Sequence, residues 1–109
     1  MTEPTTRRHV EVKEGDQTVA SAEVTTFRQP QETAQASLRA ASGHIAPGRR
    51  ANLVDAVMDL PEVRESTRLK ATLPIGDSEM LQRLQERAED VTSRRAGSTA
   101  LVDANIPSD

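Results

Sequence analysis

The stretch GHIAPGRRANLVDAV, residues 43–57, places two adjacent arginines between a glycine-containing turn and an apolar-striped segment. Backbone amides at the start of a helix carry a partial positive charge that favours anions, and glycine lets a ligand approach the backbone closely. Arg49 and Arg50 add side chains that can pair with phosphate oxygens. We therefore interpret Gly48, Arg49, Arg50 and Ala51 as a candidate cradle for a phosphate-bearing ligand. The alternative is an ordinary helix start with solvated arginines.

His44 lies beside this turn and is a candidate general base, because an imidazole titrates near neutral pH. A lone loop histidine is more often a plain surface residue, so both interpretations stay open. The chain has no Gly-x-Ser-x-Gly motif, which argues against a hydrolase built on a serine nucleophile of that kind.

The composition narrows the classes of function. The chain has no cysteine, which excludes disulfides, thiolate metal sites and cysteine nucleophiles. Its two histidines lack ligand-like spacing, so we expect no metal. The net charge of −3 is spread along the chain and Phe27 is the one aromatic residue, so we expect no nucleic-acid partner. No apolar run is long enough to cross a membrane and the first ten residues lack an apolar h-region, so we predict a cytoplasmic protein with no membrane partner.

The length of 109 residues predicts a single domain, with residues 1–7 as a disordered tail and residues 8–107 folded. Nearly all the apolar residues are aliphatic, so the core is thin. We therefore expect a homo-oligomer, most simply a homodimer that covers further apolar surface. Arginine far outnumbers lysine and alanine is abundant, a bias typical of a high-GC bacterial coding sequence.

The first part of the chain predicts strands. Val10 and Val12 alternate with charged residues, and residues 14–16 form a turn that returns residues 18–27 as the second strand of a hairpin. Residues 33–42 also alternate between apolar and polar, which favours a strand. Their alanine content also suits a helix, so that alternative stays open.

Two helices are predicted in the rest of the chain. The first begins after Pro47 and ends before Pro61. The second begins at Asp77, a good N-cap, and pairs Glu79 with Arg83 at i, i+4 on its exposed side. Its buried stripe comprises Met80, Leu81, Leu84, Ala88 and Val91.

Residues 67–75 alternate as a strand, and residues 98–106 have an apolar centre that predicts an interior strand. Arg94 and Arg95 are assigned to a solvated connection before the last strand. A helix between two strands acts as a crossover, so the third and fourth strands should be parallel, whereas the opening hairpin is antiparallel. The predicted fold is a single α/β domain with a mixed β-sheet of about five strands (β-β-β-α-β-α-β) and two principal helices.

This order, with a helix opening after a strand and a Pro/Gly/Arg turn, resembles the C-terminal two-thirds of a GNAT-type acyl-CoA N-acyltransferase. In that family the third such strand splays from its parallel neighbour, and a loop of pattern Arg/Gln-x-x-Gly-x-Gly/Ala cradles the pyrophosphate of acetyl-CoA. Alignment on residues 53–57 places Gly48 at the first motif glycine, Arg50 at the second and Ile45 at the leading position. The hairpin KEGDQTVASAEV also resembles a strand pair of that family. The resemblance implies a GNAT-like fold and acetyl-CoA or another acyl-CoA at residues 48–51.

In the geometry that the resemblance implies, Glu23 on the second strand and Glu32 before the third are candidate bases for an amine. The alternative is that both belong to an exposed strand face. The chain has no tyrosine, the frequent general acid near the thiolate in that family. Two classes of function remain: a GNAT-like domain that binds an acyl-CoA or related phosphate ligand with an incomplete catalytic set, and a non-catalytic, homodimeric protein-interaction module.

Overall fold

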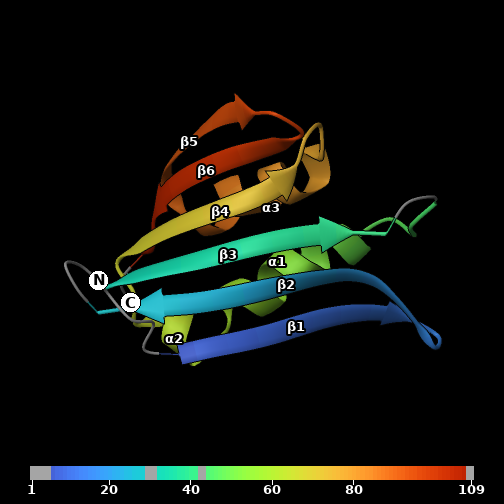
Figure 1. Cartoon of the computed structure of the whole chain (residues 1–109), viewed down its shortest axis with the longest axis horizontal. Helices are drawn as coiled ribbons and strands as arrows, with labels where there is room; N and C mark the ends of the chain where they lie inside the picture. Colours follow the sequence, from blue (N-terminus) through green and yellow to red (C-terminus); the bar gives the residue numbers. More distant parts are fainter. Residues whose placement is uncertain (1–5, 29–31, 42–43, 108–109) are drawn as a thin grey trace.

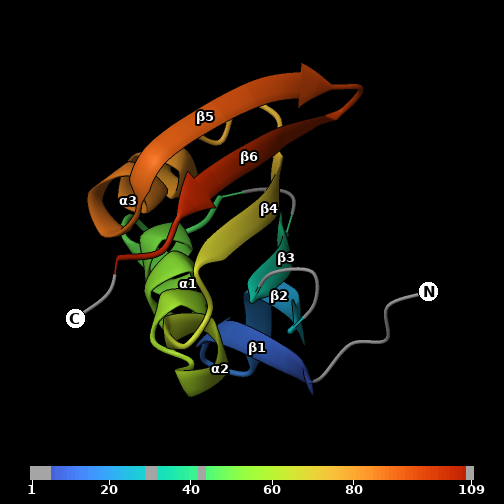
Figure 2. The same cartoon turned by 90° about the vertical axis from the view of Figure 1, so that its left-hand side faces the viewer.

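The computed structural model describes residues 6–28, 32–41 and 44–107, which form one six-stranded sheet with the helices on one of its faces (Figures 1 and 2). The strands are β1 (Thr6–Glu14), β2 (Gln17–Phe27), β3 (Thr33–Ala40), β4 (Arg68–Pro74), β5 (Glu89–Ala96) and β6 (Thr99–Asn105). The helices are α1 (Arg49–Met58), α2 (Pro61–Arg64) and α3 (Ser78–Arg87).

The strand order in the sheet is β1-β2-β3-β4-β6-β5. Neighbouring strands are antiparallel except β3 and β4, which are parallel and are connected through α1 and α2. The predicted mixed sheet, antiparallel hairpin and parallel third and fourth strands are therefore confirmed. The last strand, β6, lies between β4 and β5, as predicted for an interior strand.

The hairpin of β1 and β2 contains a β-bulge. Lys13 lies opposite Thr18, but Val12 lies opposite Ala20, so Val19 is an extra residue on β2. The bulge explains why Val19 and Ala20 are both buried although they are consecutive. It also shifts every later pair of the hairpin by one residue.

The fifth strand, β5, was assigned by sequence to the second helix and to a connection, and this prediction was wrong. The helix α3 ends at Arg87 rather than continuing to Val91, and Arg94 and Arg95 lie within β5. Ala88 and Val91 fit a helical stripe, and β5 is exposed along most of its length, so no apolar alternation marked a strand. The backbone turns away from helical geometry at Ala88, with φ −125° and ψ 168°.

The connection between α1 and β4 also differs from the prediction. Pro61 was expected to mark the end of the first helix, but α1 already ends at Met58 and Pro61 begins the four-residue helix α2. A proline is compatible with the first helical position because it lacks only an N–H that has no partner there.

Two further boundaries concern the strands. β1 begins at Thr6, inside the stretch predicted as a tail, because Thr6 pairs with Thr26 of β2. Residues 1–5 of that stretch lie outside the described residues. Residues 33–40 form a strand rather than a helix, as preferred, and residue 42 of that segment also lies outside the described part.

The core is an aliphatic layer between the sheet and the helices. Its largest fully buried side chains are Leu53, Leu69, Leu73, Met80, Leu84, Val24, Val54, Val63 and Val102. The other sheet face, which we call the open face, is lined by polar side chains such as Gln35, Lys70 and Thr72. Among the described helices, none is long and apolar enough to cross a membrane.

Candidate functional site

The parallel strands β3 and β4 separate toward their carboxyl ends. Their pairing runs from Thr33 opposite Arg68 to Ser37 opposite Thr72. Beyond that pair, β3 continues to Ala40 and β4 to Pro74, and Figure 1 shows the two strands diverging. The loop that leaves β3 at this end leads to α1, so the divergence and the start of α1 belong to the same region of the molecule.

The start of α1 has no cap of its own. Gly48 is the N-cap residue, with φ +89°, and it has no side chain that could accept a hydrogen bond. This φ lies in the left-handed region that favours glycine. The first turn of α1 contains Arg49 and Arg50 and no acidic residue. Within its own first turn the helix therefore has no residue that offsets its positive end, and two arginines add further positive charge.

Three carboxylates from elsewhere in the chain meet the residues of this helix start. The Ala51 backbone N–H donates to Oε2 of Glu79 at 2.8 Å. Arg50 Nη1 donates to Oδ2 of Asp77 at 2.7 Å, and Arg49 Nε lies 3.6 Å from Oε1 of Glu14. The four predicted residues thus do form one helix start, and internal anions contact it.

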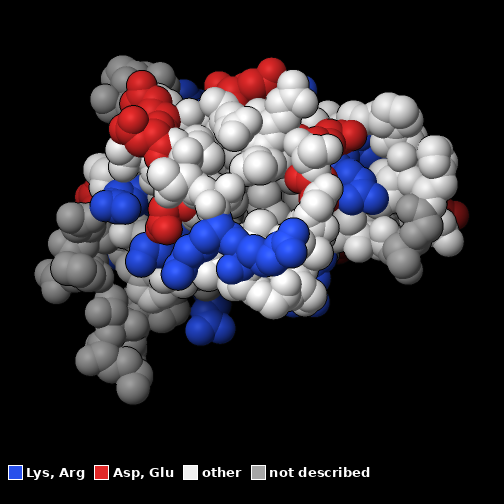
Figure 3. Space-filling model, turned by 90° about the horizontal axis from the view of Figure 1, so that it is seen from above, with Lys and Arg blue, Asp and Glu red and all other residues white. Residues whose placement is uncertain are grey.

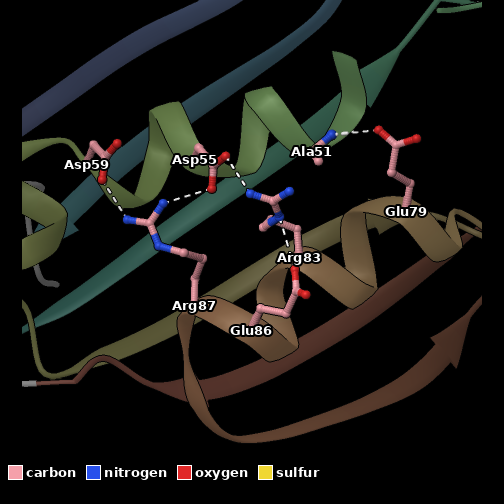
Figure 4. Close-up of polar contacts among 7 residues, drawn as sticks. All are labelled: Ala51, Asp55, Asp59, Glu79, Arg83, Glu86 and Arg87. Carbon is pink, nitrogen blue, oxygen red and sulfur yellow. Dashed lines mark hydrogen bonds and ion pairs between the residues drawn. The ribbon is translucent and has the colours of Figure 1, made fainter. Parts of the chain in front are cut away.

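Glu79 belongs to a ladder of polar contacts between α1 and α3 (Figure 4). On α3, Glu79, Arg83 and Arg87 recur every four residues. They face Ala51 and Asp55 of α1 and Asp59, the C-cap residue that directly follows α1, which recur with the same spacing. Arg83 Nη1 donates to Asp55 Oδ2 at 2.8 Å, and Arg87 Nη1 donates to Asp55 Oδ1 at 2.7 Å. Because earlier residues of α3 contact earlier residues of α1 and later residues contact later ones, the two helices are parallel and their N-terminal ends lie side by side.

The ladder corrects one sequence prediction. Glu79 and Arg83 do not form the expected i, i+4 pair on the exposed side: Glu79 contacts α1, and Arg83 pairs with Asp55 and with Glu86. The hydrogen bond from Arg87 to Asp59, with further contributions from Asp55, raises the pKa of the Arg87 guanidinium above its ordinary value.

Glu23, the predicted base on the second strand, lies exposed on the open face opposite Ser37, the last residue of β3 that pairs with β4. Its Oε1 is 2.6 Å from Nδ1 of His9 on β1, a residue that the sequence did not single out for chemistry. The hydrogen bond to Glu23, and more weakly the charge of Glu11, raises the pKa of His9 above its ordinary value. A hollow of about 440 Å³ lies beside Glu23 and is also lined by Lys70.

The other two predicted bases, His44 and Glu32, do not lie beside Glu23. His44 is exposed in the loop before α1, and no hydrogen bond or ion pair joins it to the described residues. Glu32 directly precedes β3, so the length of that strand separates it from the helix start that follows β3. Its backbone carbonyl accepts a hydrogen bond from the Thr67 amide at 2.8 Å, which is a structural role. In the described part of the chain, no group of three or more His, Cys, Asp or Glu residues could hold a metal ion.

A second basic region lies on the β5 side of the molecule. Figure 3, viewed from that edge, shows Lys and Arg side chains in a row. Arg94 and Arg95 are both exposed on β5, which is an edge strand next to β6. These arginines differ from Arg50 in position: they lie within a strand, whereas Arg50 lies in the first turn of a helix.

Comparison with solved structures identifies the architecture. A Salmonella typhimurium protein solved with its cofactor acetyl-CoA has 13% sequence identity, a TM-score of 0.63 and coverage of 94% of this chain and 65% of its own. The GNAT domain of S. lividans PAT has 14% sequence identity and a TM-score of 0.62, with coverage of 92% of this chain and 61% of its own. The ribosomal-protein-alanine N-acetyltransferase from Brucella melitensis has 16% sequence identity and a TM-score of 0.63, with coverage of 93% of this chain and 69% of its own. The chain has the GNAT acetyltransferase fold. The predicted fold is thereby confirmed.

The likeness is one of fold, because no family model matches the sequence and no curated protein matches it. The chain spans 65% and 61% of the lengths of the first two neighbours. The divergence of β3 from β4 agrees with the GNAT resemblance seen in the sequence.

Proposed function

We propose that this GNAT-fold domain binds an acyl-CoA at the diverging ends of β3 and β4. The observation that carries the proposal is the junction itself: the parallel strands stop pairing after Ser37 and Thr72, and the chain then enters a helix that starts with two arginines. Residues 48–51 would hold the diphosphate, and the unpaired strand ends would face the pantetheine arm. The Salmonella neighbour, solved with acetyl-CoA, supports this choice of ligand.

The residues at the junction fit a diphosphate in charge and in space. Arg49 and Arg50 supply two positive charges and the Ala51 amide supplies a donor at the positive end of a helix. A Cβ built on Gly48 would meet no heavy atom within 4 Å, so the approach to the backbone is open. The diphosphate would replace the half-buried Glu79 carboxylate at the Ala51 amide, and a net hydrogen bond of this kind to a charged group contributes about 1.5–3 kcal/mol. We therefore expect weak but measurable binding.

The residues on the open face do not provide a complete site for acyl transfer. A bound acyl-CoA would supply an activated thioester, and Glu23 is the candidate that would take a proton from an amine beside it. Glu23 Oε1 lies 2.6 Å from Nδ1 of His9, so this carboxylate is already paired with an imidazole rather than free to face an amine. The chain also has no tyrosine to protonate a leaving thiolate. We therefore propose a ligand-binding domain with little or no turnover.

The test is a calorimetric titration of the protein with CoA at low salt, using Arg50→Gln and a matched Arg95→Gln control. The wild type should bind with a Kd of about 0.1–1 mM. Arg50→Gln should weaken binding about five- to tenfold because a charge-assisted contact to phosphate is lost. Arg95→Gln should change the Kd less than about twofold, since a screened surface charge acts weakly at a distance. Absence of saturable binding at millimolar CoA, or equal losses in the two variants, would contradict the proposal.

The homodimer expected from the sequence stays a prediction. The surfaces that such an association would use are the outer sides of β1 and β5, the two edge strands of the sheet. Edge strands present unpaired backbone groups that can pair with another chain.

A further inference from the structure

Glu79 occupies the place at the start of α1 where an anion from outside would bind. Its carboxylate accepts the Ala51 N–H at 2.8 Å, and α1 offers no side-chain cap of its own. Figure 4 shows the Glu79 side chain extending from α3 toward the first turn of α1. An internal carboxylate at a helix start satisfies the same donor and the same positive charge that a phosphate would.

The contacts of the two nearest carboxylates differ in a way that makes Glu79 the exchangeable one. The side chain of Asp77 is 2% exposed and is held twice, by the Met80 N–H at 3.1 Å and by Arg50. Glu79 is half-buried, and the one contact that the described structure gives its carboxylate is with Ala51. A rotation of its side chain toward solvent would free the Ala51 amide without breaking the cap of α3.

The ladder behind Glu79 favours its present position. Arg83 and Arg87 on α3 pair with Asp55 of α1 and with Asp59, its C-cap residue, so the helices are held in the register that places Glu79 opposite Ala51. These pairs do not involve Glu79, so they would persist when it moves. The arrangement therefore keeps α1 and α3 together while one carboxylate can be exchanged.

We infer that Glu79 is a built-in competitor for the anion position at the start of α1 and sets the affinity of this domain for a diphosphate group. This inference rests on the proposed function and deepens it. An incoming diphosphate displaces the Glu79 carboxylate from the Ala51 N–H and takes its place beside Arg49 and Arg50. Glu79 thus selects for ligands with more negative charge than a single carboxylate.

The experiment compares Glu79→Gln and Glu79→Ala with Glu86→Gln, using CoA and inorganic pyrophosphate as separate calorimetric probes at one low salt concentration. Glu86 is a matched control because it is an exposed acid on the same helix and, among the residues that the structure describes, pairs with Arg83 alone. Glu79→Ala should bind each probe about tenfold more tightly than the wild type, Glu79→Gln should gain less, about fivefold, because its amide oxygen can still accept the Ala51 N–H, and Glu86→Gln should stay within about twofold. Thermal unfolding of each variant checks that the fold is kept, and Glu79→Gln retains an oxygen that can still cap α1 if Glu79→Ala unfolds.

Three outcomes would count against the inference, and they can be told apart. If the wild type binds and the Glu79 variants bind no more tightly than Glu86→Gln, the competitor role is overturned while the proposed function stands. If Glu79→Ala lowers the melting temperature and leaves affinity unchanged, Glu79 is only a structural cap. If neither the wild type nor any variant binds CoA or pyrophosphate, the proposed function fails and the inference with it.

Discussion

The two long helices start side by side, yet they satisfy their first turns in different ways. In α3 the cap is local: Asp77 accepts the N–H of Met80, three residues along the chain, at 3.1 Å. In α1 the N-cap is Gly48, and the carboxylate that receives the Ala51 N–H comes from Glu79, 28 residues away. A local cap forms with its helix, whereas a distant cap depends on the whole fold and can be exchanged for another anion.

The difference follows from the residues at each start. The sequence Asp77-Ser78-Glu79 provides a cap and an acidic residue in the first turn, which suits the positive end of a helix. The sequence Gly48-Arg49-Arg50 provides neither and adds positive charge. The residues of its own first turn therefore stabilise the N-terminus of α1 less than those of α3 stabilise theirs. Carboxylates from neighbouring elements supply the missing negative charge at α1.

Removing each cap in turn should have the largest effects. Asp77→Ala should lower the free energy of unfolding by about 1–2 kcal/mol, because α3 loses its cap and Arg50 loses its partner. That loss corresponds to a melting temperature lower by roughly 4–8 °C per kcal/mol in a domain of this size. Glu79→Gln should have a smaller effect, since the amide oxygen can still accept the Ala51 N–H. Ser78→Ala, at an exposed position, is the control and should change little.

Thermal and urea unfolding of these variants would check the ranking. A loss in Glu79→Gln as large as that in Asp77→Ala would mean that the tertiary cap is as fixed as the local one. The view of α1 as the adaptable helix start would then be wrong.

A smaller effect is expected from charges remote from both helix starts. The pKa of His9 is raised by its hydrogen bond to Glu23, so its contribution to stability is complete below the ordinary value of about 6.5 and is lost as the pH rises through the folded-state value. The pKa of Glu62 is lowered, chiefly by its hydrogen bond from Arg8, so its contribution is present above about 4.5 and is lost as the pH falls through the folded-state value.

Stability should therefore be greatest between about pH 5 and 6 and should fall slightly toward pH 8. Thermal unfolding across that range would measure the fall. His9→Gln should flatten the profile above pH 6 without affecting the acid side. A fall of unchanged size in His9→Gln would assign the pH dependence to another group.

Much of the fold follows from the sequence because its signals are local. Alternation marked β1, β2, β3 and β4, and Asp77 was predicted as the cap of the second helix. β5 was not predicted, because an exposed edge strand needs no apolar face and Glu89–Ala96 therefore lacks the alternation by which a strand is recognised. Its partner β6, with buried residues on one face, was found.

The candidate site was only half predictable for the same reason. The residues at the start of α1 were identified from glycine and arginine at a strand-to-helix turn, whereas the contact of Glu79 depends on how α3 lies against α1. The pair of His9 and Glu23 depends on a single bulged residue. Without the extra Val19 in the hairpin, His9 would lie opposite Ala22, and no sequence pattern fixes that bulge.

We expect the start of α1, and not the start of α3, to accept an anion from outside the protein. A two-dimensional amide NMR titration of the labelled protein with acetyl-CoA tests it most directly, because the two capped amides report separately. We predict saturable shifts centred on Ala51 and its neighbours in the first turn, with little change at the Met80 amide, whose cap is Asp77. No shift at millimolar acetyl-CoA, or shifts at Met80 as large as those at Ala51, would show that the start of α1 is not a selective anion site.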